Sequence, residues 1–251
     1  MDFEKNISSD KIEGRNPVME ALRADRPIDK IIVQNGEKNG SILKILAIAK
    51  DKRITVSYAE KAKLDKMSST GAHQGVIAYA AAKEYVSVSD ILKIAEEKNE
   101  APFIVICDDI TDPHNLGSII RSANAAGVHG VIISKHNSVG LSATVAKTSA
   151  GAVEYTPVAK VSSVAKTIDQ LKKANVWVVG ADMDGENTIH THDFSGAVAI
   201  VVGNEGKGIS HLVKEKCDFM VRIPMLGKIS SLNASVAGAL MIYEVVRSRL
   251  K

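Results

Sequence analysis

The chain has 251 residues, of which 45% are hydrophobic and 24% charged, so it is long enough to bury one large core or two small ones. Its formal net charge of +3 is compatible with a nucleic-acid partner but does not single one out. Aromatic residues make up only 4% of the chain, which argues against a stacking platform of the kind that single-strand-binding proteins use.

Two cysteines, Cys107 and Cys217, each lie inside or beside an apolar run. That placement suits a reduced interior better than a disulfide framework, and neither cysteine has metal-ligand spacing, so no metal is predicted. No uninterrupted apolar run approaches membrane-spanning length, and residues 1–5 are too acidic for a signal peptide. We therefore expect a cytoplasmic protein that does not enter a membrane.

Residues 1–82 are expected to form a small α/β domain. Asn16 and Pro17 predict the cap and the first turn of its first helix. Its other elements are expected as strands at 28–33, 54–58 and 75–81 and helices at 40–51 and 59–67. Residues 83–101 predict a linker and a short helix that Asp90 caps.

Residues 102–251 alternate apolar strands with helices, which is typical of a parallel sheet. The strands are expected at 103–110, 131–134, 155–158, 176–181, 197–203 and 219–223. The helices are expected at 116–126, 142–150, 162–173 and 234–250, with a short one after Gly208. Ligands of open α/β sheets bind outside the carboxyl ends of the strands, so we expect functional loops there.

The first such loop runs from Asp109 into the helix that follows it. Asn115 is expected to cap this helix, and Arg121 can lean back toward the same end, which favours an anion. On these residues alone, Asn115 as a plain helix cap and Arg121 as a surface or ion-paired residue are open alternatives.

Two further loops follow later strands. Gly203 to Gly208 is a glycine-rich turn with one carboxylate, Glu205, and its spacing fits neither a dinucleotide fingerprint nor a Walker loop. A plain turn with a solvated Glu205 is the alternative. Residues 223–233 separate an apolar strand from an apolar helix and predict a ligand-holding loop.

Taken in order, the three segments resemble the three motifs of the SpoU/TrmH branch of the SPOUT methyltransferases. Those segments are Asn115-Leu116-Gly117 with Arg121, Gly203-Asn204-Glu205-Gly206, and Ile223-Pro224-Met225 with Ser231-Leu232-Asn233. Members of that family methylate the ribose 2′-hydroxyl of RNA with S-adenosylmethionine. Segments 12–18, 71–76 and 112–117 look like those of RlmB-type 23S ribosomal RNA guanosine methyltransferases, so the resemblance covers essentially the whole chain.

The resemblance implies an α/β fold whose carboxyl-terminal sheet has helices on both faces and is threaded into a deep trefoil knot. It implies that a small ribosomal-protein-like RNA-binding domain precedes the sheet. It places S-adenosylmethionine against Gly203, Ile223, Met225, Leu226, Gly227 and Leu232. It places the catalytic centre around Asn115, Arg121, Glu205, Ser231 and Asn233.

Several roles have open alternatives. Arg121 can act as the base or hold a phosphate of the RNA. Arginine normally keeps its proton, which favours the phosphate-binding role. Glu205 can orient Arg121 or a backbone amide, or simply close the glycine turn. Asn233 can cap the terminal helix without touching substrate, whereas Ser231 lies where a hydroxyl could meet the ribose. His114 can be a general base, although a structural hydrogen bond suits its turn better.

The resemblance also implies partners. It predicts a homodimer through the carboxyl-terminal domain, with the helix at 234–250 in the contact, and an amino-terminal domain that selects the RNA. The expected substrate is ribosomal RNA, specifically a guanosine of 23S RNA, and transfer RNA is the alternative. A non-catalytic RNA-binding or ribosome-assembly protein is a third reading, which the presence of Asn115, Arg121, Glu205 and Asn233 disfavours.

Overall fold

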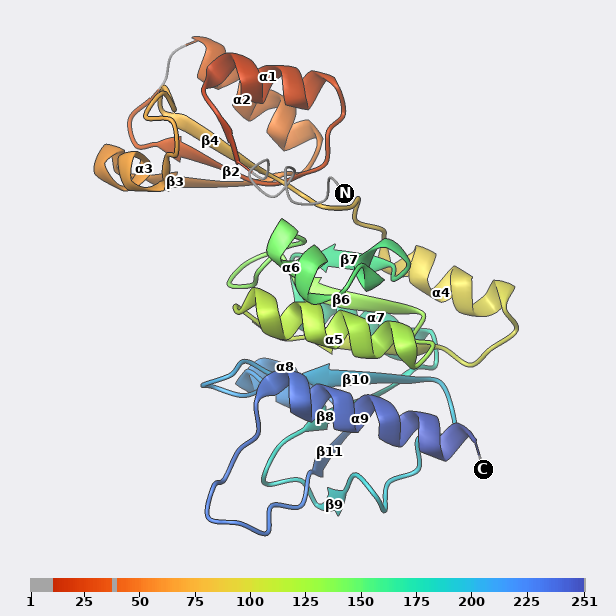
Figure 1. The fold of residues 1–251 in the computed structure, drawn as a ribbon. Coiled ribbons are helices and arrows are strands. Elements are labelled where there is room, and N and C mark those ends of the chain that lie inside the picture. The colour runs from red at the N-terminus through yellow and green to blue at the C-terminus, as the bar shows by residue number, and fades with distance from the viewer. Residues whose placement is uncertain (1–10, 38–39, 251) are drawn as a thin grey trace. The chain divides into compact units, whose positions relative to one another are not determined.

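The computed structural model describes residues 11–37 and 40–250, which form two compact units (Figure 1). The first unit contains the described residues up to Glu84 together with Leu141–Ala143, and the second contains Tyr85–Gly140 and the described residues from Thr144 onward. No helix in these described ranges is long and apolar enough to cross a membrane.

The first unit is built on a four-stranded mixed sheet in the order β1-β4-β2-β3, in which β2 and β3 are parallel. Its strands are β1 (Lys11–Glu13), β2 (Ile28–Gln34), β3 (Thr55–Ala59) and β4 (Val76–Ala80), and its helices are α1 (Arg15–Arg23), α2 (Gly40–Asp51) and α3 (Lys61–Met67). Alternation along β2 sends Ile31 and Val33 into a core with α1 and α2, and Ile32 into a second core with Leu64 of α3. Helices therefore cover both faces of this sheet.

The start of α1 differs from the prediction. Gly14, not Asn16, precedes the helix, and its φ of 95° lets the chain turn from β1 directly into α1. The amide of Arg15 then donates to the side-chain oxygen of Gln74 at 3.2 Å. Strand β1 itself was not predicted, because three residues carry too short a pattern to recognise.

The helix that opens the second unit is α4 (Val88–Glu97), and its cap also differs from the prediction. Ser87 is the N-cap, and Asp90 occupies the third helical position. The Ser87 hydroxyl accepts from the Asp90 amide at 3.1 Å, while the Asp90 carboxylate accepts from the Ser87 amide at 2.8 Å. This reciprocal capping box places residues that were predicted as linker at the beginning of the helix.

The second unit is built on a seven-stranded, all-parallel sheet in the order β7-β6-β5-β10-β8-β11-β9. Its strands are β5 (Phe103–Cys107), β6 (Gly130–Ser134), β7 (Val158–Val161), β8 (Trp177–Ala181), β9 (Asn187–Thr188), β10 (Val198–Val202) and β11 (Phe219–Arg222). Its other helices are α5 (Pro113–Ala125), α6 (Ala143–Thr148), α7 (Val164–Lys173), α8 (His211–Lys216) and α9 (Ala234–Arg249), with a 3-10 turn at Ala152–Glu154. Every residue of β5, β6 and β10 is buried, as expected for strands covered on both faces.

Two helix layers cover the central strands. Helices α5 and α9 pack side by side on one face (Figure 1), where Gly238 of α9 lies close enough to Val202 of β10 that an added Cβ would be 3.2 Å from it. Helices α7 and α8 pack together on the other face, where Ile168 and Val213 join a core with Ile104 and Val178. The predicted α/β class with a parallel sheet is confirmed, whereas the trefoil knot stays a prediction.

Three details of the second unit correct the expectations. Helix α5 begins at Pro113 and is capped by Asp112, whose carboxylate accepts from the His114 amide at 2.8 Å, so Asn115 lies inside the helix and is not its cap. Strand β7 begins at Val158, because residues 152–154 form the 3-10 turn. The two-residue strand β9 was not predicted, since it lacks an apolar run.

Candidate functional site

A cavity of about 430 Å³ lies at the carboxyl ends of β8, β10 and β11. The loops that follow these three strands form its walls together with the first turns of α9. Because the strands are parallel and adjacent, loops that are far apart in sequence meet at one edge of the sheet. This is the edge at which the sequence predicted functional loops.

The glycine turn after β10 forms one wall. A Cβ on Gly203 would lie 2.3 Å from the carbonyl carbon of Gly208, so only glycine fits there. Asn204 and Gly208 exchange two backbone hydrogen bonds of 2.9 Å, and the Asn204 side-chain oxygen accepts from the amide of Gly206 at 3.0 Å. The Asn204 side-chain nitrogen donates to the carbonyl of Asp109 at 2.8 Å, which fixes the turn to the loop after β5.

The carboxylate of Glu205 joins the first two motifs. Asn115, which is only 5% exposed, donates from its side-chain nitrogen to Glu205 Oε1 at 2.8 Å. The side chain of Asn204 donates to Glu205 Oε2 at 3.2 Å. The hydrogen-bond partners of Glu205 are thus two side-chain amides, one of them within the glycine turn, and its part in catalysis stays a prediction.

Arg121 is exposed on α5, six residues after Asn115 and about 9 Å further along the helix axis. The guanidinium has no hydrogen bond or ion pair with any of residues 11–37 and 40–250. It does not line the cavity. All of its donors are therefore open to an incoming anion.

The third motif loop reaches from β11 to α9 (Figure 1) and contributes to the cavity from both of its ends. The lining residues among the predicted ones are Gly203, Glu205, Ile223, Met225, Ser231 and Leu232. Leu226, which is 99% exposed, and Gly227 lie outside the lining. Asn233 caps α9, with Oδ1 accepting from the amides of Ser235 at 2.9 Å and Val236 at 3.3 Å, so the structure shows the capping role.

The loop after β8 is the wall that sequence reasoning missed. Asp182, Met183 and Asp184 line the cavity, and Asp182 forms an ion pair with Lys214 of α8. Burial alone would raise the pKa of Asp182, but the hydrogen bonds from Lys214 and from the amides of Asp184 and Met183 outweigh it and lower this pKa. The signal was a carboxylate directly after a buried strand, although the sequence did not show that this strand lies beside β10.

Helix α9 contributes small and flexible residues to the same cavity. Ala237, Gly238 and Met241 line it, as does Lys207 of the glycine turn. The cavity thus combines apolar side chains, backbone groups of a tight turn, and charged groups of both signs. Such a lining suits a small molecule that has both an apolar ring and a charged end.

Residues 102–243 match the model of a protein family described as the SpoU rRNA Methylase family. The chain belongs to that family. Residues 11–86 match a second model, described as RNA 2′-O ribose methyltransferase substrate binding. The resemblance that the three motifs predicted is therefore confirmed, and the cavity of this SpoU family enzyme lies among those motifs.

Two curated relatives carry TrmH family names. YacO of Bacillus subtilis, assigned to the TrmH family of tRNA/rRNA methyltransferases, is 48% identical over 240 residues, which is 96% of each chain. A Staphylococcus aureus protein with the same family assignment is 48% identical over 238 residues, which is 95% of this chain and 96% of its own. Both relatives align over both units of the SpoU family enzyme.

Two solved structures share the fold along nearly all of the chain. The SpoU methyltransferase AviRb from Streptomyces viridochromogenes, in complex with the cofactor AdoMet, is 25% identical with a TM-score of 0.61 and aligns over 99% of this chain and 94% of its own. An RNA 2′-O ribose methyltransferase is 28% identical with a TM-score of 0.56, and it aligns over 100% of this chain and 93% of its own.

Proposed function

We propose that this SpoU family enzyme methylates the ribose 2′-hydroxyl of a guanosine in 23S ribosomal RNA, with S-adenosylmethionine as the methyl donor. The observation that carries the proposal is the cavity at the ends of β8, β10 and β11, which the second and third motif loops line. Through the bond between Asn115 and Glu205, the first motif is fixed to the same site.

The cavity suits S-adenosylmethionine. Ile223, Met225 and Leu232 offer apolar surface for its adenosine, and the exposed backbone of the turn at Gly203 offers amides and carbonyls. The structure of AviRb holds AdoMet, which supports the same cofactor here. For Leu226 and Gly227 the proposed cofactor contact rests on the family resemblance, because these residues lie outside the lining.

When bound, S-adenosylmethionine supplies a methyl group on a positively charged sulfur. Catalysis by the chain is then mainly positioning of the ribose hydroxyl. We assign Arg121 to a phosphate of the RNA, because its guanidinium is exposed, offers a planar set of N–H donors and has no competing partner among the described residues. Ser231, at the cavity rim, is assigned to the ribose.

Glu205 and Asn233, the remaining residues of the proposed catalytic centre, hold other groups in position. Glu205 holds the buried amide of Asn115 and so fixes α5 against the glycine turn. Asn233 fixes the end of the third loop by capping α9. Both are positioning residues in this proposal, and neither needs to move a proton.

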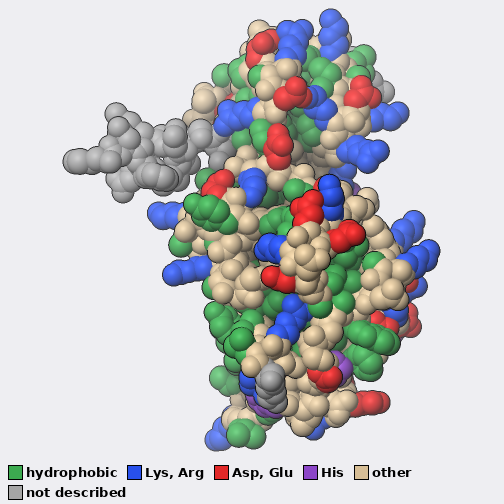
Figure 2. Space-filling view, turned by 90° about the vertical axis from the view of Figure 1, so that its right-hand side faces the viewer, with side chains coloured by type: hydrophobic (Ala, Val, Ile, Leu, Met, Phe, Trp, Pro, Cys, Tyr) green, Lys and Arg blue, Asp and Glu red, His purple; other side chains and the backbone are tan. Residues whose placement is uncertain are grey.

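The domain organisation supports an RNA substrate. We propose domains at 1–82 and 102–251 joined by 83–101, and the substrate-binding model over residues 11–86 supports an RNA-selecting first domain. On the face that Figure 2 shows, acidic and basic side chains are interspersed, so charge alone does not mark the RNA path there. Transfer RNA is the second candidate, because the relatives' names include both RNAs.

A homodimer is also part of the proposal. Val236, Leu240 and Tyr243 form an exposed apolar stripe on α9, beside a shallow hollow that Ser118 and Ser122 of α5 also line. Such a stripe is suited to a second copy of the chain. Sedimentation of the protein and of Leu240→Glu measures this: the wild type is expected as a dimer and the variant as a monomer. The trefoil knot is proposed on the family resemblance, and the cytoplasmic location on the two free cysteines, which suit a reduced interior.

The test of the reaction is transfer of labelled methyl from S-adenosylmethionine to ribosomal and transfer RNA in separate incubations, followed by nucleoside mass spectrometry. The expected product is 2′-O-methylguanosine from 23S RNA. Label on a base would overturn the ribose assignment, and label only on transfer RNA would overturn the 23S assignment. The non-catalytic alternative would be favoured if the protein bound RNA, transferred no methyl group and gave no heat of S-adenosylmethionine binding in calorimetry.

A further inference from the structure

A second cavity, of about 270 Å³, lies at the opposite end of the same strands. Its lining includes the first residues of β8, β10 and β11, which are Trp177, Val198 and Phe219. Along β8, Val179 lines this cavity and Ala181 lines the proposed cofactor cavity, so about 7 Å of strand separates the two linings. None of the three motifs contributes to this cleft, which we call the aromatic cleft.

The sheet face inside the aromatic cleft is covered by an irregular segment instead of a helix. Phe219 pairs in register with Val179, so Trp177, Val179 and Phe219 present their side chains on one face. The segment between β9 and β10 passes over this face and supplies Thr191, His192, Asp193 and Phe194 to the lining.

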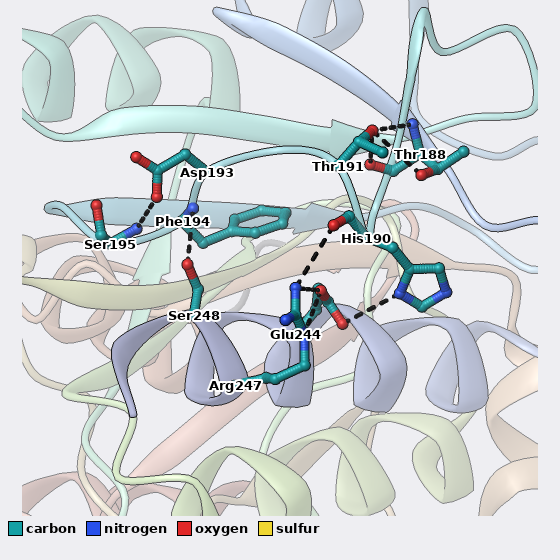
Figure 3. A network of polar contacts seen from close by, with 9 residues as sticks. All are labelled: Thr188, His190, Thr191, Asp193, Phe194, Ser195, Glu244, Arg247 and Ser248. Atoms are coloured by element: carbon teal, nitrogen blue, oxygen red, sulfur yellow. Dashed lines mark hydrogen bonds and ion pairs between the residues drawn. The ribbon is translucent and has the colours of Figure 1, made fainter. Parts of the chain in front are cut away.

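Helix α9 holds that segment in place (Figure 3). The Glu244 carboxylate, which is buried, lies 3.3 Å from His190 Nδ1 and accepts from Arg247 Nε at 2.8 Å. The Phe194 amide donates to the Ser248 hydroxyl at 3.3 Å, and the Phe194 ring is buried. One wall of the cleft is thus fixed by a hydrogen-bonded network, so the cleft is a built feature and not a loose surface hollow.

Aromatic rings gather here in a chain that has few of them. The rings of Trp177 and Phe219 lie 5.6 Å apart between centroids, and His192 lies 4.9 Å from Phe219 and 4.7 Å from Phe194. Trp177, the only tryptophan in the sequence, is 57% exposed, and Phe219 is 41% exposed. The low aromatic content argued against a broad stacking surface, but these rings are concentrated at one place.

Polar groups in the cleft have unused hydrogen-bonding capacity. The ring nitrogens of His192 have no partner in the described part of the chain, and burial lowers the pKa of this histidine, so the imidazole is neutral near pH 7. A neutral imidazole both donates and accepts. The Asp193 carboxylate accepts from the Ser195 amide at 2.9 Å and also from the hydroxyls of Ser195 and Ser248, which leaves part of its accepting capacity for a ligand.

We propose that the aromatic cleft binds one unstacked base of the RNA substrate, stacked on Trp177, in contact with Phe219, and hydrogen-bonded by His192 and Asp193. Exposed ring faces beside directional polar groups match the flat faces and polar edges of a nucleobase. A purely apolar docking segment of a protein would leave those polar groups unpaired. The inference rests on the proposed function only in taking RNA as the ligand, and it adds a contact that positions RNA away from the reacting ribose.

Because Trp177 is the only tryptophan, its fluorescence reports this cleft directly. We would titrate the full-length protein, without S-adenosylmethionine, with a single-stranded RNA oligonucleotide, with the four nucleoside monophosphates, and with inorganic polyphosphate. RNA and at least one monophosphate are expected to quench the fluorescence saturably, and polyphosphate is not. Phe219→Leu is expected to weaken the apparent RNA affinity measured by quenching about five- to a hundredfold.

Tyr155→Leu is the matched control, since Tyr155 is an exposed aromatic residue outside the aromatic cleft, and its quenching curve should equal that of the wild type. Calorimetry should give the same S-adenosylmethionine affinity for Phe219→Leu and the wild type, which shows that the variant is folded.

Three outcomes would each overturn the base site: polyphosphate quenching that equals quenching by RNA, no quenching by any base-bearing probe, or no effect of Phe219→Leu. A change of Trp177 fluorescence on dilution of the protein alone would overturn it in favour of a contact between copies. Absence of cofactor heat in the wild type contradicts the proposed function and leaves the quenching result intact.

Discussion

Asn115 and Glu205 are 90 positions apart, and their side chains meet in a hydrogen bond of 2.8 Å. Asn115 is buried on α5, whereas Glu205 belongs to the glycine turn after β10. A buried amide that lost this acceptor would remain unsatisfied, since little water reaches it. The first two motifs are therefore joined by a direct contact, and this contact fixes the helix that carries Arg121.

Glu205→Gln should impair methyl transfer. The substitution keeps the shape and one acceptor but removes the charge that strengthens the bonds from Asn115 and Asn204. Hydrogen bonds to charged groups contribute about 1.5–3 kcal/mol, so we expect kcat/KM to fall by about tenfold or more. Steady-state kinetics measure this. Glu215→Gln, an exposed carboxylate of α8 outside the cavity, is the control and should behave as wild type.

Gly203→Ala should disturb the proposed cofactor wall. The new Cβ would lie 2.3 Å from Gly208 in backbone that cannot move aside cheaply, and such overpacking costs about 1–3 kcal/mol. We expect a lower free energy of unfolding and a loss of S-adenosylmethionine affinity, measured by denaturation and calorimetry. Gly40→Ala is the control, because its Cβ would have no atom within 4 Å among the described residues and Gly40 lies outside the cavity. Equal cofactor affinity in the two variants would contradict the proposed wall.

Arg121→Lys should separate activity from folding. Arg121 is exposed and has no partner among the described residues, so the unfolding midpoint should not change measurably. Lysine keeps the charge but cannot form the bidentate hydrogen bonds that arginine makes to phosphate. We therefore expect turnover to fall about tenfold or more over a full pH profile. Lys166→Ala removes an exposed cation from α7 on the other face of the sheet and should keep turnover. Wild-type turnover with unchanged RNA binding in Arg121→Lys would end the phosphate assignment.

The parallel sheet could be predicted because its strands are short, apolar and buried on both faces, which leaves a clear pattern in the sequence. The ends of those strands identified Gly203, Ile223 and Ser231, and the cavity brings all three together. Element boundaries were accurate mainly where an apolar run ends abruptly, as at both ends of α2.

Strand order could not be read in the same way. β10 lies between β5 and β8, and this position alone decides that Asp182 shares the cavity and that Asn115 reaches Glu205. Long-range pairing leaves no local periodicity in the sequence. The predictions of the helix caps were wrong for a different reason. Several polar residues near each helix start can serve as the cap. At α4 the choice between Ser87 and Asp90 depends on a reciprocal pair of bonds.

The amino-terminal unit should lose stability in acid through Glu13. Ser68 Oγ and the amides of Ser69 and Thr70 all donate to this carboxylate. Burial alone would raise the pKa of Glu13, but these hydrogen bonds outweigh it and lower the pKa from 4.5 to about 2. The folded pKa is below the unfolded one, so the contribution is fully present above about pH 4.5 and is lost as the pH falls toward 2.

Glu13→Gln isolates that contribution, because the amide keeps an acceptor but no longer titrates. We expect the urea midpoint of the wild type to fall further than that of Glu13→Gln between about pH 5 and about pH 2.5, since only the wild type must protonate this group. Glu20→Gln is the matched control: Glu20 pairs only with Arg23 on the exposed side of α1, and its pH dependence should follow the wild type. Parallel curves for wild type and Glu13→Gln would show that the Ser68–Thr70 loop does not depend on an ionised Glu13.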